Sequence, residues 1–313
     1  MSFTAEVKDE LSRVPAECPS CDRATLAALI RIEGTLSISG PGRYRLELAT
    51  ETSSVARTAI RLLHSIYDLK TELTVRRSVL HKTHNYLITI PAQPKLPKML
   101  DEMGILGSQG LDMGVAPHLV ERPCCLAAYL RGVFMACGFI SDPKGDFHFE
   151  MNVESRTLAD DLVRLMQEHG VDAKVTQRRN SYTVYLKGSD RIVSFLALTS
   201  AHHAALQIEN ERVRKSIRND VNRAVNAELA NQMKASDAAA SQIRDIELIE
   251  RHLGLESLSP ALQDFCELRR RNDSVSLREL GELATPPLSK SAVYHRVRRL
   301  EEIATELREK GLV

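Results

Sequence analysis

An internal repeat is the feature that most constrains how this chain can fold. Residues Leu26–Gly34 read LAALIRIEG, and 104 residues later Leu130–Gly138 read LRGVFMACG. Both segments are apolar, end in Gly and are followed by alternating polar and apolar residues, which predicts a helix, a tight turn and a strand. A chain that makes this unit twice is expected to form two similar halves.

The elements that follow keep the same order in both halves. At an offset of 103 the alternating strand residues match face for face: Tyr44, Leu46 and Leu48 with Phe147, Phe149 and Met151. A helix is predicted next, at residues 52–67 and 155–169, and then two more strands. Small residues, which a close helix crossing needs, occur in both repeated helices: Ala27, Ala28, Gly132 and Ala136. We expect an α+β, pseudo-twofold domain of two αββαββ halves, at about residues 20–90 and 124–204.

The character of the sequence changes after residue 204. Residues 205–234 and 237–253 contain no Pro and carry dense charge at helical spacing, which predicts long polar helices. Further on, Ser259 and Pro260 suit the start of a helix, and Ser276 with Glu279 forms a capping box for the next. We therefore expect a domain at 1–204, a helical linker at 205–254 and an all-α domain at 255–313.

The last two predicted helices resemble a helix-turn-helix. Ser289 is expected to cap a final helix that ends near Lys310 and buries one stripe: Val293, Val297, Leu300, Ala304 and Leu307. Its first half is basic, and acidic residues begin only at Glu301.

In a helix-turn-helix the start of the second helix enters the major groove. The predicted DNA-binding residues are therefore Arg278, Ser289, Lys290, Ser291, Tyr294, His295, Arg298 and Arg299. Lys290 suits a phosphate, Arg298 a guanine edge or a phosphate, and Tyr294 and His295 base edges. The alternative is a solvated basic face of a small helical bundle.

The repeated helix resembles the LAGLIDADG motif of homing endonucleases. In that family the last acid of each motif binds a divalent metal between the scissile phosphates. Glu33 holds this position in the first copy, but Cys137 holds it in the second. A thiol is a poor ligand for Mg²⁺, so the catalytic pair is broken and we expect no enzyme. The alternative is a metal-dependent nickase that uses Glu33 alone.

The expected DNA-facing positions of the strands are mixed in sign. They are Arg43, Arg45 and Glu47 in one copy and His148, Glu150 and Asn152 in the other. Glu47 and Glu150 would face phosphates, which predicts a saddle with weakened DNA affinity.

The whole arrangement is similar to the WhiA family of bacterial transcription regulators. The similar segments are Leu130–Pro143, Asn222–Lys234 and Pro286–Leu300, although Ala227 and Leu229 stand where the family pattern has Cys and Thr. The resemblance implies a sequence-specific DNA-binding regulator of sporulation and cell-division genes. In actinobacteria it also implies an iron–sulfur partner of the WhiB type. A different possibility is an adaptor that binds a protein through residues 1–204 and reads no DNA sequence.

Composition limits where the chain can bind and where it works. Its 42 Lys and Arg residues against 41 Asp and Glu leave a net charge of +1, so any DNA-binding surface must be local. The most apolar stretch, 124–140, is shorter than the roughly 20 residues that a membrane span needs. The N-terminus predicts an ordinary helix capped by Thr4, with Phe3, Val7, Leu11 and Val14 at helical spacing. We expect a cytoplasmic, nucleoid-associated protein without cofactor.

Four of the six cysteines suggest a separate hypothesis. Cys21 and Cys125 are 104 residues apart, so the repeat places both near the starts of the paired helices, with Cys18 and Cys124 beside them. The four could form a tetrahedral zinc site, although only Cys18 and Cys21 have ligand spacing. The alternative is that they are small buried hydrophobic residues of a reduced cytosolic protein.

Overall fold

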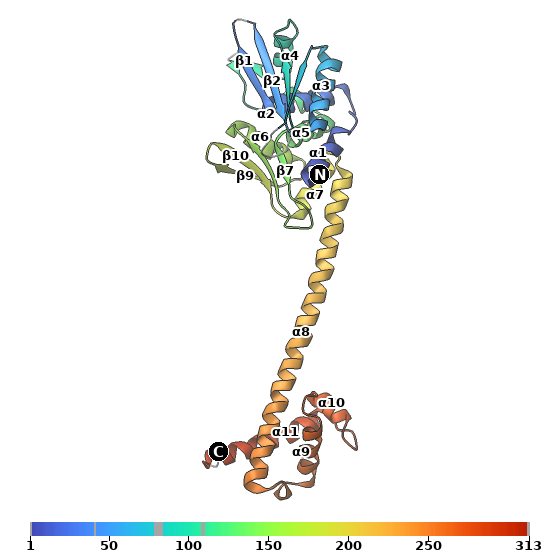
Figure 1. The fold of residues 1–313 in the computed structure, drawn as a ribbon, viewed down its shortest axis with the longest axis vertical. Coiled ribbons are helices and arrows are strands. Elements are labelled where there is room, and N and C mark those ends of the chain that lie inside the picture. The colour runs from blue at the N-terminus through green and yellow to red at the C-terminus, as the bar shows by residue number, and fades with distance from the viewer. Residues whose placement is uncertain (1, 41, 78–83, 108–109, 312–313) are drawn as a thin grey trace. The chain divides into compact units, whose positions relative to one another are not determined.

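The computed structural model describes residues 2–40, 42–77, 84–107 and 110–311, which form two compact units at 1–215 and 216–313 (Figure 1). In the first unit, two halves repeat one topology. The first half contains α2 (Pro19–Glu33), β1 (Gly34–Ile38), β2 (Tyr44–Thr50), α3 (Ser53–Tyr67), β3 (Glu72–Arg77) and β4 (His84–Ile90). The second contains α5 (Pro123–Cys137), β7 (Gly138–Ile140), β8 (Phe149–Val153), α6 (Arg156–Glu168), β9 (Ala173–Arg178) and β10 (Ser181–Leu186).

Both sheets are antiparallel and have equivalent strand orders. These orders are β1-β2-β4-β3 and β7-β8-β10-β9, which confirms the predicted pair of αββαββ halves. The alternating residues predicted to face inward are buried, among them Leu46 and Leu48 on β2 and Phe149 and Met151 on β8. Each sheet therefore turns one apolar face toward a shared core.

Further elements connect and flank the halves. The connector contains α4 (Leu96–Glu102), β5 (Leu106–Gly107), β6 (Gly110–Leu111) and the short 3₁₀ helix η1 (Pro117–Leu119). α1 (Phe3–Ser12) precedes the first half and α7 (Ser189–Leu198) follows the second.

The predicted cap of α1 is wrong. Ser2 is the N-cap and accepts from the Ala5 N–H at 3.3 Å. Thr4 lies inside the helix, where its hydroxyl donates to the Ile140 carbonyl at 2.6 Å and accepts from the Ile140 N–H at 3.0 Å. These hydrogen bonds to β7 outweigh the preference of Thr for a cap position. They join residues far apart in sequence, so no local sequence pattern predicts them.

Helices α2 and α5 form the centre of the first unit and join the two halves (Figure 1). Their backbones approach closely at Gly132, where an added Cβ would lie 2.6 Å from the Thr25 carbonyl oxygen and 2.7 Å from the Ala28 Cβ. The Thr25 hydroxyl donates to the Ala128 carbonyl at 3.1 Å across the same crossing. Of the small residues predicted at this crossing, Ala28 and Gly132 lie at the close approach and allow the two helices to meet.

A single 52-residue helix, α8 (His202–Leu253), runs where the sequence suggested long polar helices. Its first turns add Ala204 and Ile208 to the core of the first unit, and Ile246 and Ile249 near its end belong to the core of the second. Residues 216–234 between them are exposed all round. Side chains near each end of α8 therefore belong to a hydrophobic core, whereas its middle packs against neither core.

The second unit is all-α after α8. Its elements are the 3₁₀ helix η2 (Leu255–Ser257), α9 (Pro260–Arg271), α10 (Leu277–Glu282) and α11 (Lys290–Glu309). The five residues predicted as the buried stripe of α11 are all buried: Val293, Val297, Leu300, Ala304 and Leu307. They pack with Phe265 of α9 and Leu280 of α10.

The crossing at Gly132 gives a stability prediction. We expect Gly132→Val to lower the free energy of unfolding by about 1–3 kcal/mol, because both atoms that its Cβ would meet belong to tightly packed α2. Urea denaturation measures the change. Gly145→Ala is the control, since its nearest neighbour would be 3.6 Å away. Equal stability of the two variants would contradict a crossing limited by backbone contact.

Candidate nucleic-acid interface

Side-chain caps and a tight turn hold the two helices of the candidate DNA-binding motif. The Ser276 hydroxyl accepts from the Glu279 N–H at 3.3 Å, and the Glu279 carboxylate accepts from the Ser276 N–H at 2.8 Å, which completes the predicted capping box of α10. The Ser289 hydroxyl caps α11 by accepting from the Ala292 N–H at 3.2 Å. Both helix starts lie where the sequence placed them.

The turn between α10 and α11 depends on Gly281. The Leu288 N–H donates to the Gly281 carbonyl at 2.8 Å, and an added Cβ at Gly281 would lie 2.6 Å from the Leu288 carbonyl oxygen. A larger residue would push the segment before α11 away from α10. The close approach thus sets how the two helices are oriented.

The predicted DNA-binding residues all lie on the surface. Those exposed on α10 and α11 and at the cap are Arg278, Ser289, Lys290, Ser291, Tyr294, His295, Arg298 and Arg299. Tyr294 is 58 % exposed, which is unusual for an aromatic side chain that has a core beneath it. The helix thus presents a polar, basic face opposite its buried stripe.

Acidic neighbours on the same helices partly neutralise this face. Glu302 pairs with both Arg298, at 3.4 Å, and Arg299, at 3.0 Å, and Glu282 pairs with Arg278 at 3.1 Å. These pairs are exposed and contribute little to stability, so a phosphate can replace the carboxylate at small cost. The pairs hold the arginine side chains along the exposed faces of α10 and α11.

Sequence reasoning missed the structural role of Arg269. Its side chain is buried at the end of α9, and its Nη1 donates to the carbonyls of Asn272, at 3.2 Å, and Val275, at 2.8 Å. The guanidinium thereby holds the loop that leads into α10. An arginine in the last turn of a helix is also the usual complement to the helix dipole, so its spacing gave no distinguishing signal.

Glu33 and Cys137 end α2 and α5, as the repeat predicted, and Lys8 of α1 lies beside them. Its ammonium donates to the Ala136 carbonyl at 3.2 Å and has Glu33, Cys137 and Glu51 as electrostatic neighbours. A side-chain cation thus stands near the place where the LAGLIDADG resemblance puts a divalent metal. Lys8 follows Thr4 by one helical turn, so both face the second half, but only the tertiary contact shows it.

Burial disfavours the ionised forms of Glu33 and Cys137. Burial raises the pKa of Glu33 to about 7, against the Thr50 hydroxyl and the Lys8 ammonium, which both lower it. Burial also raises the pKa of the Cys137 thiol to about 12. Near neutral pH the pair therefore offers a partly protonated carboxyl and a thiol, whereas Mg²⁺ needs ionised oxygen ligands.

On the strand faces of each half, charged side chains form ion pairs with one another. Arg45 forms an ion pair with Glu47 at 2.7 Å, and Glu150 contacts His148 at 3.1 Å and Arg178 at 3.7 Å. The acids therefore neutralise much of the basic charge that a DNA saddle would present.

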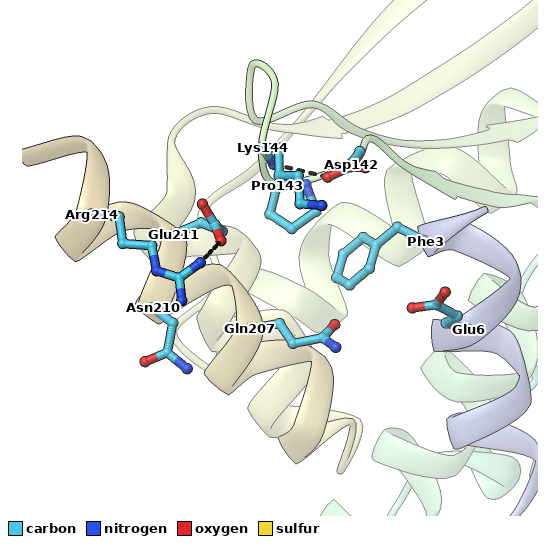
Figure 2. A pocket seen from close by; sticks show the side chains of 9 residues that line it. All are labelled: Phe3, Glu6, Asp142, Pro143, Lys144, Gln207, Asn210, Glu211 and Arg214. Atoms are coloured by element: carbon cyan, nitrogen blue, oxygen red, sulfur yellow. Dashed lines mark hydrogen bonds and ion pairs between the residues drawn. The ribbon is translucent and has the colours of Figure 1, made fainter. Parts of the chain in front are cut away.

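Figure 2 shows a pocket of about 350 Å³ formed by α1, the loop after β7 and the first turns of α8. Arg214 turns toward Glu211 and donates to its carboxylate at 2.8 Å, while the Lys144 N–H donates to the Asp142 carboxylate at 2.9 Å. Arg214 and Glu211 therefore balance each other's charge, and the Asp142 carboxylate is occupied by a backbone N–H of its own loop.

The four cysteines of the sequence hypothesis converge at the other end of the helix pair. Cys18, Cys21, Cys124 and Cys125 have their sulfur atoms within 4.8 Å of one another. The structure therefore places Cys124 and Cys125 in the same cluster as Cys18 and Cys21, although adjacent cysteines lack the usual spacing of zinc ligands.

Fold and site together place this chain in the class of proteins that combine a LAGLIDADG-like domain with a helix-turn-helix. Two LAGLIDADG-like halves with a broken acidic pair precede an all-α unit that presents a helix-turn-helix.

Family comparisons identify the particular family. Three family descriptions match the chain: the WhiA N-terminal LAGLIDADG-like domain at residues 19–106, the WhiA LAGLIDADG-like domain at 126–218 and the WhiA C-terminal HTH domain at 221–304. The chain belongs to the WhiA family.

Individual relatives agree over nearly the full length. A probable cell division protein WhiA of Desulforamulus reducens is 43 % identical, covering 98 % of this chain and 97 % of the relative. One of Heliobacterium modesticaldum is 41 % identical, with 99 % and 98 % covered. The crystal structure of full-length DUF199/WhiA from Thermotoga maritima has the same fold, with a TM-score of 0.61, 24 % identity and 98 % and 99 % covered.

Among the helices of the described residues, none is both long and apolar enough to cross a bilayer.

The raised pKa of Glu33 predicts a pH-dependent stability. The folded pKa, about 7, lies above the ordinary value of 4.5, so this carboxyl favours folding below about pH 4.5 and loses that contribution as pH rises through 7. We expect Glu33→Gln to raise the free energy of unfolding by about 2–3 kcal/mol at pH 8 and to change it little at pH 5. Urea titrations at both pH values measure this.

Glu51→Gln is the matched control, because Glu51 also lies near Lys8 but is exposed. It should keep the pH dependence of the parent protein. If Glu33→Gln changed the free energy of unfolding by the same amount at pH 8 as at pH 5, the raised pKa of Glu33 would be contradicted.

Proposed function

We propose that this protein is a transcription regulator that binds specific DNA sequences through its helix-turn-helix and does not cleave DNA. The observation that carries the proposal is the face of α11, where a basic, exposed surface lies opposite the buried stripe. Such a surface at the start of a second helix suits the major groove. The net charge of +1 makes nonspecific attraction by the rest of the chain weak.

Each residue of this face has a proposed role. Lys290 and the capped start of α11 bind a phosphate, because the free N–H groups and the helix dipole attract an anion there. Tyr294 and His295 contact base edges, and Arg298 reaches a guanine edge or a phosphate. Arg278 and Arg299 contact the DNA backbone on either side.

The target genes are proposed from the relatives. Curated relatives are named probable cell division proteins, and we infer that this chain regulates genes of cell division and sporulation while bound to the nucleoid in the cytoplasm. We further infer that the LAGLIDADG-like unit serves as a platform for a protein partner, which in an actinobacterial setting would be of the WhiB type.

The alternative, a metal-dependent nickase, depends on Glu33. The position of Lys8 and the raised pKa of Glu33 argue against it. We expect no Mg²⁺-dependent nicking of a bound promoter fragment in a gel assay with supercoiled and linear substrates. Nicking by the parent protein that Glu33→Gln abolishes would establish the nuclease instead.

Removing the two paired arginines tests the proposed DNA interface. Promoter fragments are first identified by genome-wide immunoprecipitation of the full-length protein, and their affinities are then measured by fluorescence anisotropy at physiological salt. We expect Arg298→Ala and Arg299→Ala each to weaken binding by about 1–3 kcal/mol, roughly fivefold to 150-fold, as base or phosphate contacts do.

Arg271→Ala is the matched control, because Arg271 is an exposed, ion-paired arginine of the same unit that lies on α9. Its affinity should equal that of the parent. If Arg298→Ala and Arg299→Ala bound DNA as tightly as this control, α11 would not be the element that recognises DNA. Promoter peaks that persist in a variant carrying both Arg298→Ala and Arg299→Ala would lead to the same conclusion.

A further inference from the structure

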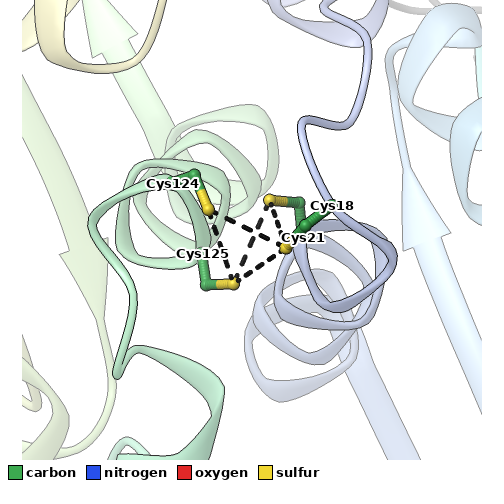
Figure 3. A group of neighbouring side chains, drawn as sticks. All are labelled: Cys18, Cys21, Cys124 and Cys125. Atoms are coloured by element: carbon green, nitrogen blue, oxygen red, sulfur yellow. Dashed lines mark hydrogen bonds between the residues drawn. The ribbon is translucent and has the colours of Figure 1, made fainter.

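Four cysteines from the two halves meet at the starts of the paired helices. Cys18 is the N-cap of α2 and Cys21 lies in its first turn, while Cys124 and Cys125 lie in the first turn of α5. Both helices begin with a proline, and Cys21 and Cys125 occupy the same position after it. Figure 3 shows the four side chains pointing toward one another from the two helix ends.

The distances between the sulfur atoms suit one specific kind of occupant. Cys18 lies 3.4 Å from Cys21, 3.8 Å from Cys124 and 3.5 Å from Cys125, and the Cys21–Cys125 and Cys124–Cys125 distances are both 4.0 Å. All four sulfur atoms lie within 4.8 Å of one another. A tetrahedron of sulfur atoms around Zn²⁺, with Zn–S bonds of about 2.3 Å, has edges of about 3.8 Å. The cluster is already close to that size.

We propose that Cys18, Cys21, Cys124 and Cys125 together bind one Zn²⁺ ion, which joins the two halves of the LAGLIDADG-like unit. Four sulfur ligands make a closed tetrahedral site, which is the structural rather than the catalytic form of zinc coordination. Each thiol releases its proton when it binds the metal, and the complex then carries a net charge of −2. This role is independent of DNA recognition by α11.

The surroundings can accommodate that charge. The ligands lie at the positive ends of two helix dipoles, which stabilise anions. The Arg131 guanidinium of α5 adds a cation within electrostatic range of Cys21. Cys21 and Cys125 are buried, at 2 % and 3 % exposed, whereas Cys18 and Cys124 are partly exposed and leave a route by which the ion can enter.

Other occupants fit the cluster less well. A disulfide requires sulfur atoms at about 2.05 Å, well below every distance in the cluster. An iron–sulfur cluster places its own iron and sulfide atoms between the thiolates and needs them farther apart. Mg²⁺ and Ca²⁺ prefer oxygen ligands. The sulfur-rich tetrahedron therefore favours zinc.

Elemental analysis of the full-length protein tests the proposal. The chain is produced without a histidine tag and purified under reducing conditions without chelators, and its metals are measured by mass spectrometry. We expect about one zinc ion per chain, and we expect Cys21→Ser/Cys125→Ser to reduce this content at least about tenfold. Cys137→Ala, a cysteine at the other end of α5, is the matched control and should retain the metal.

A second measurement needs no variant. Zinc in the parent protein is exchanged for Co²⁺, whose absorption reports tetrahedral coordination and thiolate-to-metal charge transfer. We expect both signatures, and we expect removal of zinc with a chelator to lower the melting temperature of the unit by several degrees. Zinc below about a tenth of an equivalent would overturn the proposal. So would iron with acid-labile sulfide, disulfides found by intact mass, or a Co²⁺ spectrum without charge transfer.

Discussion

The close crossing of α2 with α5 is the contact on which the rest of the first unit depends. Gly132 lets the two backbones approach, and the Thr25–Ala128 hydrogen bond fixes their register. Because each helix continues directly into the first strand of its half, the crossing also sets how the two sheets are placed. It brings Glu33 near Cys137 at one end of the pair and the four cysteines together at the other.

These two ends have different chemistry although they are built from the same repeat. The C-terminal ends carry a carboxyl whose pKa is raised by burial, a half-buried thiol and a lysine ammonium, a set that suits a hard metal ion poorly. The N-terminal ends carry four convergent sulfur atoms, which suit a soft one. In a scaffold that resembles a nuclease, one end of the helix pair thus disfavours a hard metal ion, and the other has the geometry of the zinc site proposed above.

Much of this architecture could be predicted from the sequence, because its signals are local or repeated. The offset near 104 predicted two equal halves, and capping residues such as Ser276 and Ser289 predicted the starts of α10 and α11. The repeat also placed the four cysteines near one another. The contacts of Thr4 and Lys8 could not be predicted in this way, because their partners lie more than a hundred residues away in sequence and only the packing of the elements brings them together.

The position of Lys8 also determines how the C-terminal ends of α2 and α5 would respond to a second carboxylate. An acid in place of Cys137 would lie beside an ammonium that already donates to the Ala136 carbonyl and has Glu33 as a neighbour. One ammonium can balance only one of the two carboxylates, and a divalent metal ion would have to compete with it for them. Building a hard-metal site between these helix ends would therefore require a change in α1 as well as in α5.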